Sequence, residues 1–147
     1  MKIAKKRLLS LLLSAALLFT ALPMTAIAEK ELPLQASGEP VIYLDYKGME
    51  QTCNTYTALT AEYILSNSST LTDGWYVVDS TFAYNSRVTI SGNAHIILTD
   101  SANMTASKGI TVEGSNSLTI YGQSGGTGKL TATGSKDCDA GIGGGER

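Results

Sequence analysis

Between residues 87 and 134 the chain alternates apolar and polar residues in short runs. The first copy of the pattern has three such runs, Val88-Thr-Ile90, Ile96-Ile-Leu98 and Met104-Thr-Ala106, and Gly, Asn, Ser and Asp lie between them. Alternation with a period of two is typical of half-buried strands, and the intervening residues favour turns. The pattern therefore predicts three strands and three turns in each copy.

A second copy follows the first in the same order of apolar, glycine and hydroxyl positions. The alignment matches Val88 with Ile110, Ile90 with Val112, Gly92 with Gly114, Ile96 with Leu118, Leu98 with Ile120, Met104 with Leu130 and Ala106 with Ala132. It needs about four extra residues after Tyr121, and a third copy begins where Gly141-Ile142 matches Gly109-Ile110.

A repeat of about 20 to 25 residues is typical of a solenoid. Three strands per repeat predict an all-β fold, a parallel β-helix, with Ile96 and Leu98 inside and His95 and Ile97 outside. Thr89 is expected above Thr111 on the outer surface. A β-sandwich or a propeller blade has similar glycine-punctuated strands, but only stacked coils require the copies to match in register.

The N-terminus has the pattern of a secretory signal peptide over residues 1–28. Lys2, Lys5, Lys6 and Arg7 precede an apolar run, and Ala26-Ile-Ala28 forms a small-residue cleavage site. An uncleaved membrane anchor is the alternative, although the apolar run is short for a span. We expect the protein to be secreted or associated with the cell wall, without a membrane segment after cleavage.

The remaining chain divides into three parts, which together form one small domain. Residues 29–40 are polar and predict a flexible leader. Residues 41–74 predict an N-terminal cap that starts with a strand, a turn at Tyr46-Lys-Gly48 and a returning strand. Residues 75–147 predict the β-helix coils, with Trp75 or Phe82 closing the core of the first coil. Because the last coil stops within its third repeat, we expect further coils beyond Arg147.

Removal of the signal peptide makes the chain acidic. Four of the eleven basic residues lie in that segment, so seven basic and thirteen acidic residues give the remainder a net charge of −6. Nucleic acid and anionic membranes bind to basic surfaces, so neither is an expected partner. Cations are the ligands that this charge favours.

Four acidic residues are candidate calcium ligands, because hard oxygen donors on turns suit this ion. They are Asp100, Glu113, Asp137 and Asp139. The alternative role of such residues is hydrogen bonding to the turn backbone.

Other motifs favour structural roles. Gly125-Gly-Thr-Gly-Lys129 lacks two positions of a phosphate-binding loop, so it predicts a connection between strands.

Cys53 and Cys138 are the two cysteines; a disulfide between them is one possibility, and two unpaired thiols are the other. His95 has no identifiable catalytic partner and is expected to pack on the surface.

The sequence has no recognisable catalytic triad, zinc ligand set or pair of glycosidase carboxylates. We therefore expect no enzymatic activity. A polysaccharide lyase needs only Ca²⁺ and one basic side chain, so Arg87 and Lys129 leave it as a distant alternative.

Aromatic residues concentrate before the regular coils, where their flat faces could stack on sugar rings or fill a cap. Tyr84 and Tyr121, with the stacked threonines Thr89 and Thr111, are the candidate carbohydrate-binding residues.

Several runs resemble a known family. They are Gly74-Trp-Tyr-Val-Val78, Val88-Thr-Ile-Ser-Gly92, Lys108-Gly-Ile-Thr-Val112, Ser117-Leu-Thr-Ile-Tyr-Gly-Gln123, Gly128-Lys-Leu-Thr-Ala132 and Ala140-Gly-Ile-Gly-Gly-Gly145. Together they are similar to secreted surface proteins of Gram-positive anaerobes described as carbohydrate-binding domain-containing proteins. The resemblance implies a right-handed parallel β-helix, extracellular display, binding to plant or host polysaccharide and, in some members, Ca²⁺.

Two functions follow as expectations. The first is a non-catalytic polysaccharide-binding or adhesin-like module, assisted by calcium. The alternative is a structural stalk that separates a downstream module from the cell wall.

Overall fold

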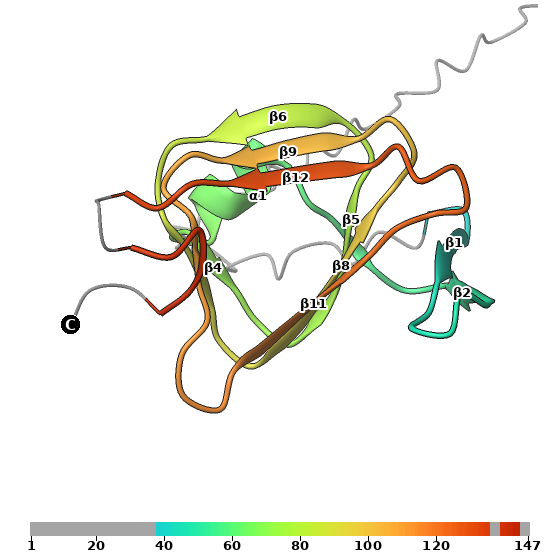
Figure 1. Cartoon of the computed structure of the whole chain (residues 1–147), viewed down its shortest axis with the longest axis horizontal. Coiled ribbons are helices and arrows are strands. Elements are labelled where there is room, and N and C mark those ends of the chain that lie inside the picture. Colours follow the sequence, from blue (N-terminus) through green and yellow to red (C-terminus); the bar gives the residue numbers. More distant parts are fainter. Residues whose placement is uncertain (1–37, 136–138, 145–147) are drawn as a thin grey trace, which may run out of the picture. The chain divides into compact units, whose positions relative to one another are not determined.

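The computed structural model describes residues 38–135 and 139–144, which contain a parallel β-helix, a two-stranded antiparallel hairpin and one short helix. Three strands per coil belong to three parallel sheets that surround one apolar core (Figure 1). The predicted all-β solenoid is therefore confirmed. The predicted signal peptide, residues 1–28, and most of the predicted leader lie outside the described residues.

Each sheet collects the equivalent strand of successive coils. Sheet I contains β4 (Thr70–Leu71), β7 (Val88–Ile90), β10 (Ile110–Thr111) and β13 (Ile142–Gly143). Sheet II contains β3 (Thr57–Ala58), β5 (Gly74–Val78), β8 (Asn93–Leu98) and β11 (Ser117–Tyr121). Sheet III contains β6 (Thr81–Tyr84), β9 (Asn103–Ala106) and β12 (Lys129–Ala132).

The register in sheets I and III confirms the sequence alignment. Val88 pairs with Ile110 and Thr89 with Thr111, while Met104 pairs with Leu130. Ile110 in turn pairs with Ile142, so the third copy begins where the glycine match placed it. Stacking of like side chains buries the aliphatic residues of the middle coil almost completely, which stabilises the coil by removing apolar area from water.

The register in sheet II differs from the alignment by two residues. Ile120 pairs with Ile96, and Leu118 with Ala94, so the predicted matches of Leu98 with Ile120 and Ile96 with Leu118 are wrong. The reason is the turn lengths. Two of the four extra residues lie in the turn before β11 and two in the turn after it, rather than all four after Tyr121. A shift of two keeps the same residues facing inward, so the core composition is unaffected.

The first coil begins at Thr70, earlier than predicted. Leu71 is fully buried and pairs with Ile90, which places β4 in the coil rather than in the cap. Trp75 does not close the core, because Tyr76 is the inward residue and pairs with Ile96. Phe82, the other residue predicted to close the core of the first coil, packs against the core.

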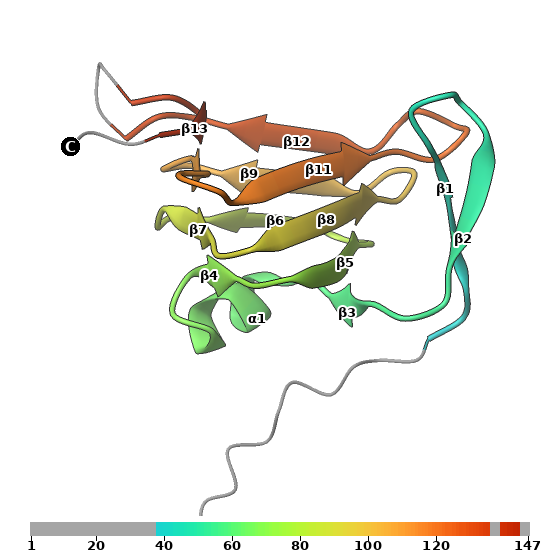
Figure 2. The same ribbon diagram turned by 90° about the horizontal axis from the view of Figure 1, so that it is seen from below.

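A short helix covers the first coil. In α1 (Ala61–Ser66), the Thr60 hydroxyl accepts a hydrogen bond from the Tyr63 amide at 3.1 Å, which satisfies a free donor of the first turn. Ile64 is fully buried in the main core, and Leu59 enters the same core just before the helix. Figure 2 shows α1 at the β4 end of the stack, opposite β12 and β13. This part of residues 41–74 therefore packs on the core at the β4 end of the coils.

The rest of the predicted cap is a hairpin that packs on the side of the coils. Strand β1 (Val41–Leu44) pairs antiparallel with β2 (Glu50–Cys53), as the strand–turn–strand pattern predicted. The Leu44 amide donates to the Gly122 carbonyl at 2.9 Å, and Gln123 Nε2 donates to the Ile42 carbonyl at 2.7 Å. The hairpin is thus fixed to the third coil.

Candidate functional site

The hairpin covers part of the outer face of sheet II, where a second apolar cluster forms. Val77 and Ile97 are register partners on β5 and β8, and both point away from the main core. Cys53 of the hairpin covers them, so all three are buried. Ile97 is therefore outward, as predicted, and yet excluded from water.

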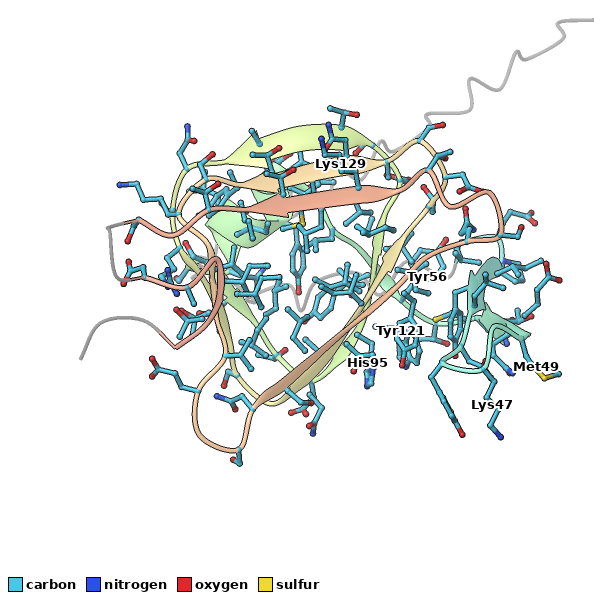
Figure 3. The ribbon with its side chains drawn as sticks, in the orientation of Figure 1. Lys47, Met49, Tyr56, His95, Tyr121 and Lys129 are labelled. Carbon is cyan, nitrogen blue, oxygen red and sulfur yellow. The ribbon has the colours of Figure 1, made fainter. Side chains whose placement is uncertain are left out.

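Beside this cluster lie four aromatic rings, which we call the aromatic cluster: Tyr43, Trp75, His95 and Tyr121. One comes from each of β1, β5, β8 and β11. Strand pairing brings Trp75 beside His95, and docking of the hairpin adds Tyr43. Figure 3 shows His95 and Tyr121 on the outer side of sheet II, toward the hairpin.

The rings of the aromatic cluster contact one another closely. Trp75 stacks on His95 with centroids 4.6 Å apart and planes at 19°, and on Tyr121 at 5.2 Å and 22°. Tyr43 meets Tyr121 edge to face at 4.8 Å. Such contacts hold each ring in one orientation. The Tyr121 hydroxyl also lies 3.4 Å from His95 Nδ1.

A groove of about 300 Å³ opens between the hairpin and sheet II. Its lining residues are Tyr43, Thr52, Cys53, Asn54, Thr55 and Trp75. Sheet II contributes Trp75 and the hairpin contributes Tyr43, while the exposed residues Thr52, Asn54 and Thr55 bring hydroxyl and amide groups to the lining. A small concave site with apolar faces and a few polar groups is the usual form of a ligand site.

Cys53 lies at the floor of the groove as a free thiol. Burial raises the pKa of Cys53, which keeps the thiol protonated and a poor nucleophile. Its Sγ donates to the Thr55 carbonyl at 3.4 Å, so the thiol serves the local fold. Cys138, the other half of the predicted disulfide, lies outside the described residues.

The predicted carbohydrate residues do not form one site. Tyr121 belongs to the aromatic cluster. Tyr84 is only 8% exposed and lies in the main core, with its hydroxyl 2.7 Å from Ser69 Oγ, so its ring is not offered to a ligand. Its position on β6 makes it an inward residue of the first coil, which corrects its assignment as a binding residue.

Thr89 and Thr111 stack on sheet I, as predicted, but this is a different side of the coil from the aromatic cluster. The Thr111 hydroxyl accepts a hydrogen bond from Arg87 Nε at 2.5 Å. This threonine therefore links neighbouring turns rather than presenting a free hydroxyl row.

The predicted calcium ligands lie apart, since the coil places them in three different turns. Asp100 lies between β8 and β9, Glu113 between β10 and β11, and Asp139 between β12 and β13. Asp137 falls outside the described residues. Within the part of the chain that the structure describes, no group of three His, Cys, Asp or Glu residues could hold a metal ion. The three described members of the predicted set therefore lie in separate turns.

Asp100 instead organises the longer turn of the next coil. Its carboxylate accepts hydrogen bonds from the Gly125 amide at 3.1 Å and from the Thr127 amide and hydroxyl at 3.2 Å each. A Cβ on Gly125 would lie 2.4 Å from Asp100 Oδ2, so this glycine allows the close approach. Asp100 therefore has the alternative role considered for the acidic turn residues, which is hydrogen bonding to the turn backbone.

Arg87 joins the turns of three coils. Its guanidinium donates to the Lys108 carbonyl at 2.9 Å and to the Ala140 carbonyl at 3.2 Å, and it lies 3.7 Å from the Asp139 carboxylate. Lys129, the other basic residue considered for lyase chemistry, is exposed on sheet III (Figure 3). The two side chains come from different sides of the coil and do not share a site.

Sequence reasoning did not select Tyr43, Trp75 or the groove residues. Trp75 and His95 occupy equivalent outward positions of successive coils, and that equivalence was the available signal. The run Gly74-Trp-Tyr-Val-Val78 obscured it, because four consecutive apolar residues do not show which two face inward.

A scan against protein-family models returns no match, and searches of curated proteins and of solved structures return no match at the significance required. Among the described residues, no helix is both long enough and apolar enough to cross a membrane.

Proposed function

We propose that the protein is a secreted or cell-surface module that binds polysaccharide without catalysis, and that the groove beside Trp75 is its binding site. The observation that supports this most directly is the position of Trp75. Its indole lines the groove and is in contact with three other rings, those of Tyr43, His95 and Tyr121.

Sugar rings suit this arrangement for two reasons. The C–H face of a pyranose packs on an aromatic face, while its hydroxyl groups need hydrogen-bond partners at the ring edge. Here Trp75 of sheet II and Tyr43 of the hairpin bring aromatic rings, and Thr52, Asn54 and Thr55 bring polar groups. The volume of about 300 Å³ is at the lower end for ligand sites and fits a short stretch of a glycan.

The parallel coils favour this function because they form a rigid support. Every described strand from β3 onward pairs in parallel with a neighbouring coil, so the outer face of sheet II changes little when a ligand binds. A preorganised site loses less conformational entropy on binding. The same rigidity would serve a stalk, which is the competing function, but a stalk has no need of the groove.

The test is retention of the protein by insoluble plant and host polysaccharides. Trp75→Ala should weaken retention at least about tenfold, since a central tryptophan commonly dominates binding. Tyr46→Ala is the matched control, because Tyr46 is 88% exposed at the hairpin turn, outside the groove lining, and its loss should leave retention unchanged. Far-ultraviolet circular dichroism verifies the fold, and Trp75→Phe provides a milder variant with an intermediate loss.

Each other outcome has a definite meaning. Equal retention of the parent chain and Trp75→Ala would place the site elsewhere. Retention by no polymer would favour the stalk. Release of unsaturated sugar ends from a retained polymer would restore the lyase alternative.

A further inference from the structure

We infer that the groove takes an electrically neutral glycan and discriminates against uronic-acid, sulfated and phosphorylated polymers. The inference rests on the proposed function and narrows the ligand of the same site. It follows from the charges around the groove rather than from the rings.

The groove itself has no charged lining residue: the six side chains are those of two aromatic residues, two threonines, an asparagine and a buried cysteine. The raised pKa of Cys53 keeps its thiol neutral as well. A carboxylate brought into this groove would lose water without gaining a cation, which is a costly exchange.

The strands that support the groove are also free of charge. β5, β8 and β11 contain no Lys, Arg, Asp or Glu. The turns that flank these strands contain Asp73 before β5, Asp79 after β5 and Asp100 after β8. The field along this face is therefore negative, and it repels an anionic polymer.

The hairpin has the same sign. Residues 38–58 contain three acidic side chains, Glu39, Asp45 and Glu50, against one basic side chain, Lys47. Lys47 lies in the turn with its ammonium 5.3 Å from the centroid of the Tyr46 ring, outside the groove lining (Figure 3). Neither wall of the groove thus provides the cation that an acidic sugar requires.

The experiment compares polymers that share a backbone and differ in charge, by retardation of the full chain in native gels. Hydroxyethylcellulose is paired with carboxymethylcellulose, and carboxyl-reduced polygalacturonate with its parent polymer. We expect a neutral member of a pair to retard the protein at least about tenfold more strongly than its acidic counterpart. Raising the ionic strength should leave retardation by the neutral polymer unchanged, since no charge pair is screened.

A gain-of-function variant provides a second test. Asn54→Lys places a cation in the groove and should raise retardation by the acidic polymer several-fold. Lys47→Gln, outside the groove, is the matched control and should leave the order of preference unchanged.

The failures are distinguishable. Equal or stronger retardation by the acidic members would overturn the inference and leave polysaccharide binding in place. Retardation by acidic polymers only with calcium, abolished by a chelator, would overturn it in favour of an ion bridge. Retardation by none of the polymers tested would overturn both the inference and the proposed function.

Discussion

Trp75 and His95 are register partners on β5 and β8, and their rings stack with centroids 4.6 Å apart. Strand pairing therefore places the imidazole beside the indole that lines the groove, and the stacking helps to hold the indole in one orientation. His95 supports Trp75 through this stacking.

His95→Ala should weaken polysaccharide retention about twofold to tenfold, because an aromatic pair contributes about 0.5–1.5 kcal/mol and Trp75 would lose its support. His95→Phe should restore retention, since a flat ring returns. Thr119→Ala is the control: Thr119 is the next residue in the same row, exposed and outside the aromatic cluster. Loss of retention in His95→Phe equal to that in His95→Ala would show that the imidazole itself contacts the glycan.

Ile96 and Ile120 provide a test of the register in sheet II. They are paired residues in successive coils, yet Ile96 is fully buried and Ile120 is 39% exposed. Ile96→Ala should lower the free energy of unfolding by about 2–5 kcal/mol, and Ile120→Ala by clearly less, because only the first leaves a closed cavity. Urea denaturation measures both. Equal losses would contradict the burial of the middle coil.

Gly92 occupies a position where a side chain meets two obstacles. Its φ is +107°, and an added Cβ would lie 2.4 Å from an oxygen of Asp73, whose other oxygen accepts from the Asn93 amide at 2.8 Å. Gly92→Ala should cost about 3 kcal/mol or more in the free energy of unfolding.

Gly114→Ala is the matched control. Gly114 has a φ of +63° with open space around the Cβ position, so the cost should be near 1 kcal/mol. If thermal or urea unfolding finds Gly92→Ala no worse than Gly114→Ala, the close approach of Asp73 is disproved.

The hairpin turn should respond to acid through Asp45. Hydrogen bonds from the Met49 amide at 2.9 Å and the Lys47 amide at 2.8 Å lower the pKa of Asp45 below its ordinary value of 3.8. A lowered folded pKa means that this support is present above about pH 4 and is lost as the pH falls through the folded value.

The amide resonances of Lys47 and Met49 in proton–nitrogen spectra would follow this titration. Their midpoint should lie below pH 3.8, the ordinary Asp value. Asp45→Asn should remove the titration from both amides. A midpoint at or above the ordinary value would mean that these hydrogen bonds do not favour the ionised carboxylate.

The sequence predicted the coil because its information is local and repeated. Val88 matches Ile110, and Met104 matches Leu130, one coil further along the chain. Glycines and alternating apolar residues mark where each strand begins and ends. The register of Ile96 was predicted wrongly for two reasons. The two residues inserted before β11 have the same composition as the turn that they lengthen. A shift of two residues also preserves the alternation of apolar and polar positions.

The groove could not be predicted for a different reason. It depends on the packing of the hairpin against residues about 80 positions later in the sequence, as in the hydrogen bond from Gln123 to the Ile42 carbonyl. Such contacts leave no periodic pattern in the sequence. Ile97 was predicted to point outward, but its sequence position did not indicate that Cys53 of the hairpin covers it. The separation of Asp100 from Glu113 was also not predicted, because the sequence does not show that the two turns lie at different corners of the coil.

Trp75 is the chain's single tryptophan, so its fluorescence reports directly on the groove. The decisive measurement is the emission of the full protein during titration with a soluble neutral oligosaccharide from a polymer that retains it. A saturable change in intensity and wavelength, with the same midpoint as binding heat from calorimetry, is the expected result. Binding heat without any change in tryptophan emission would place the glycan away from Trp75 and contradict the proposed site.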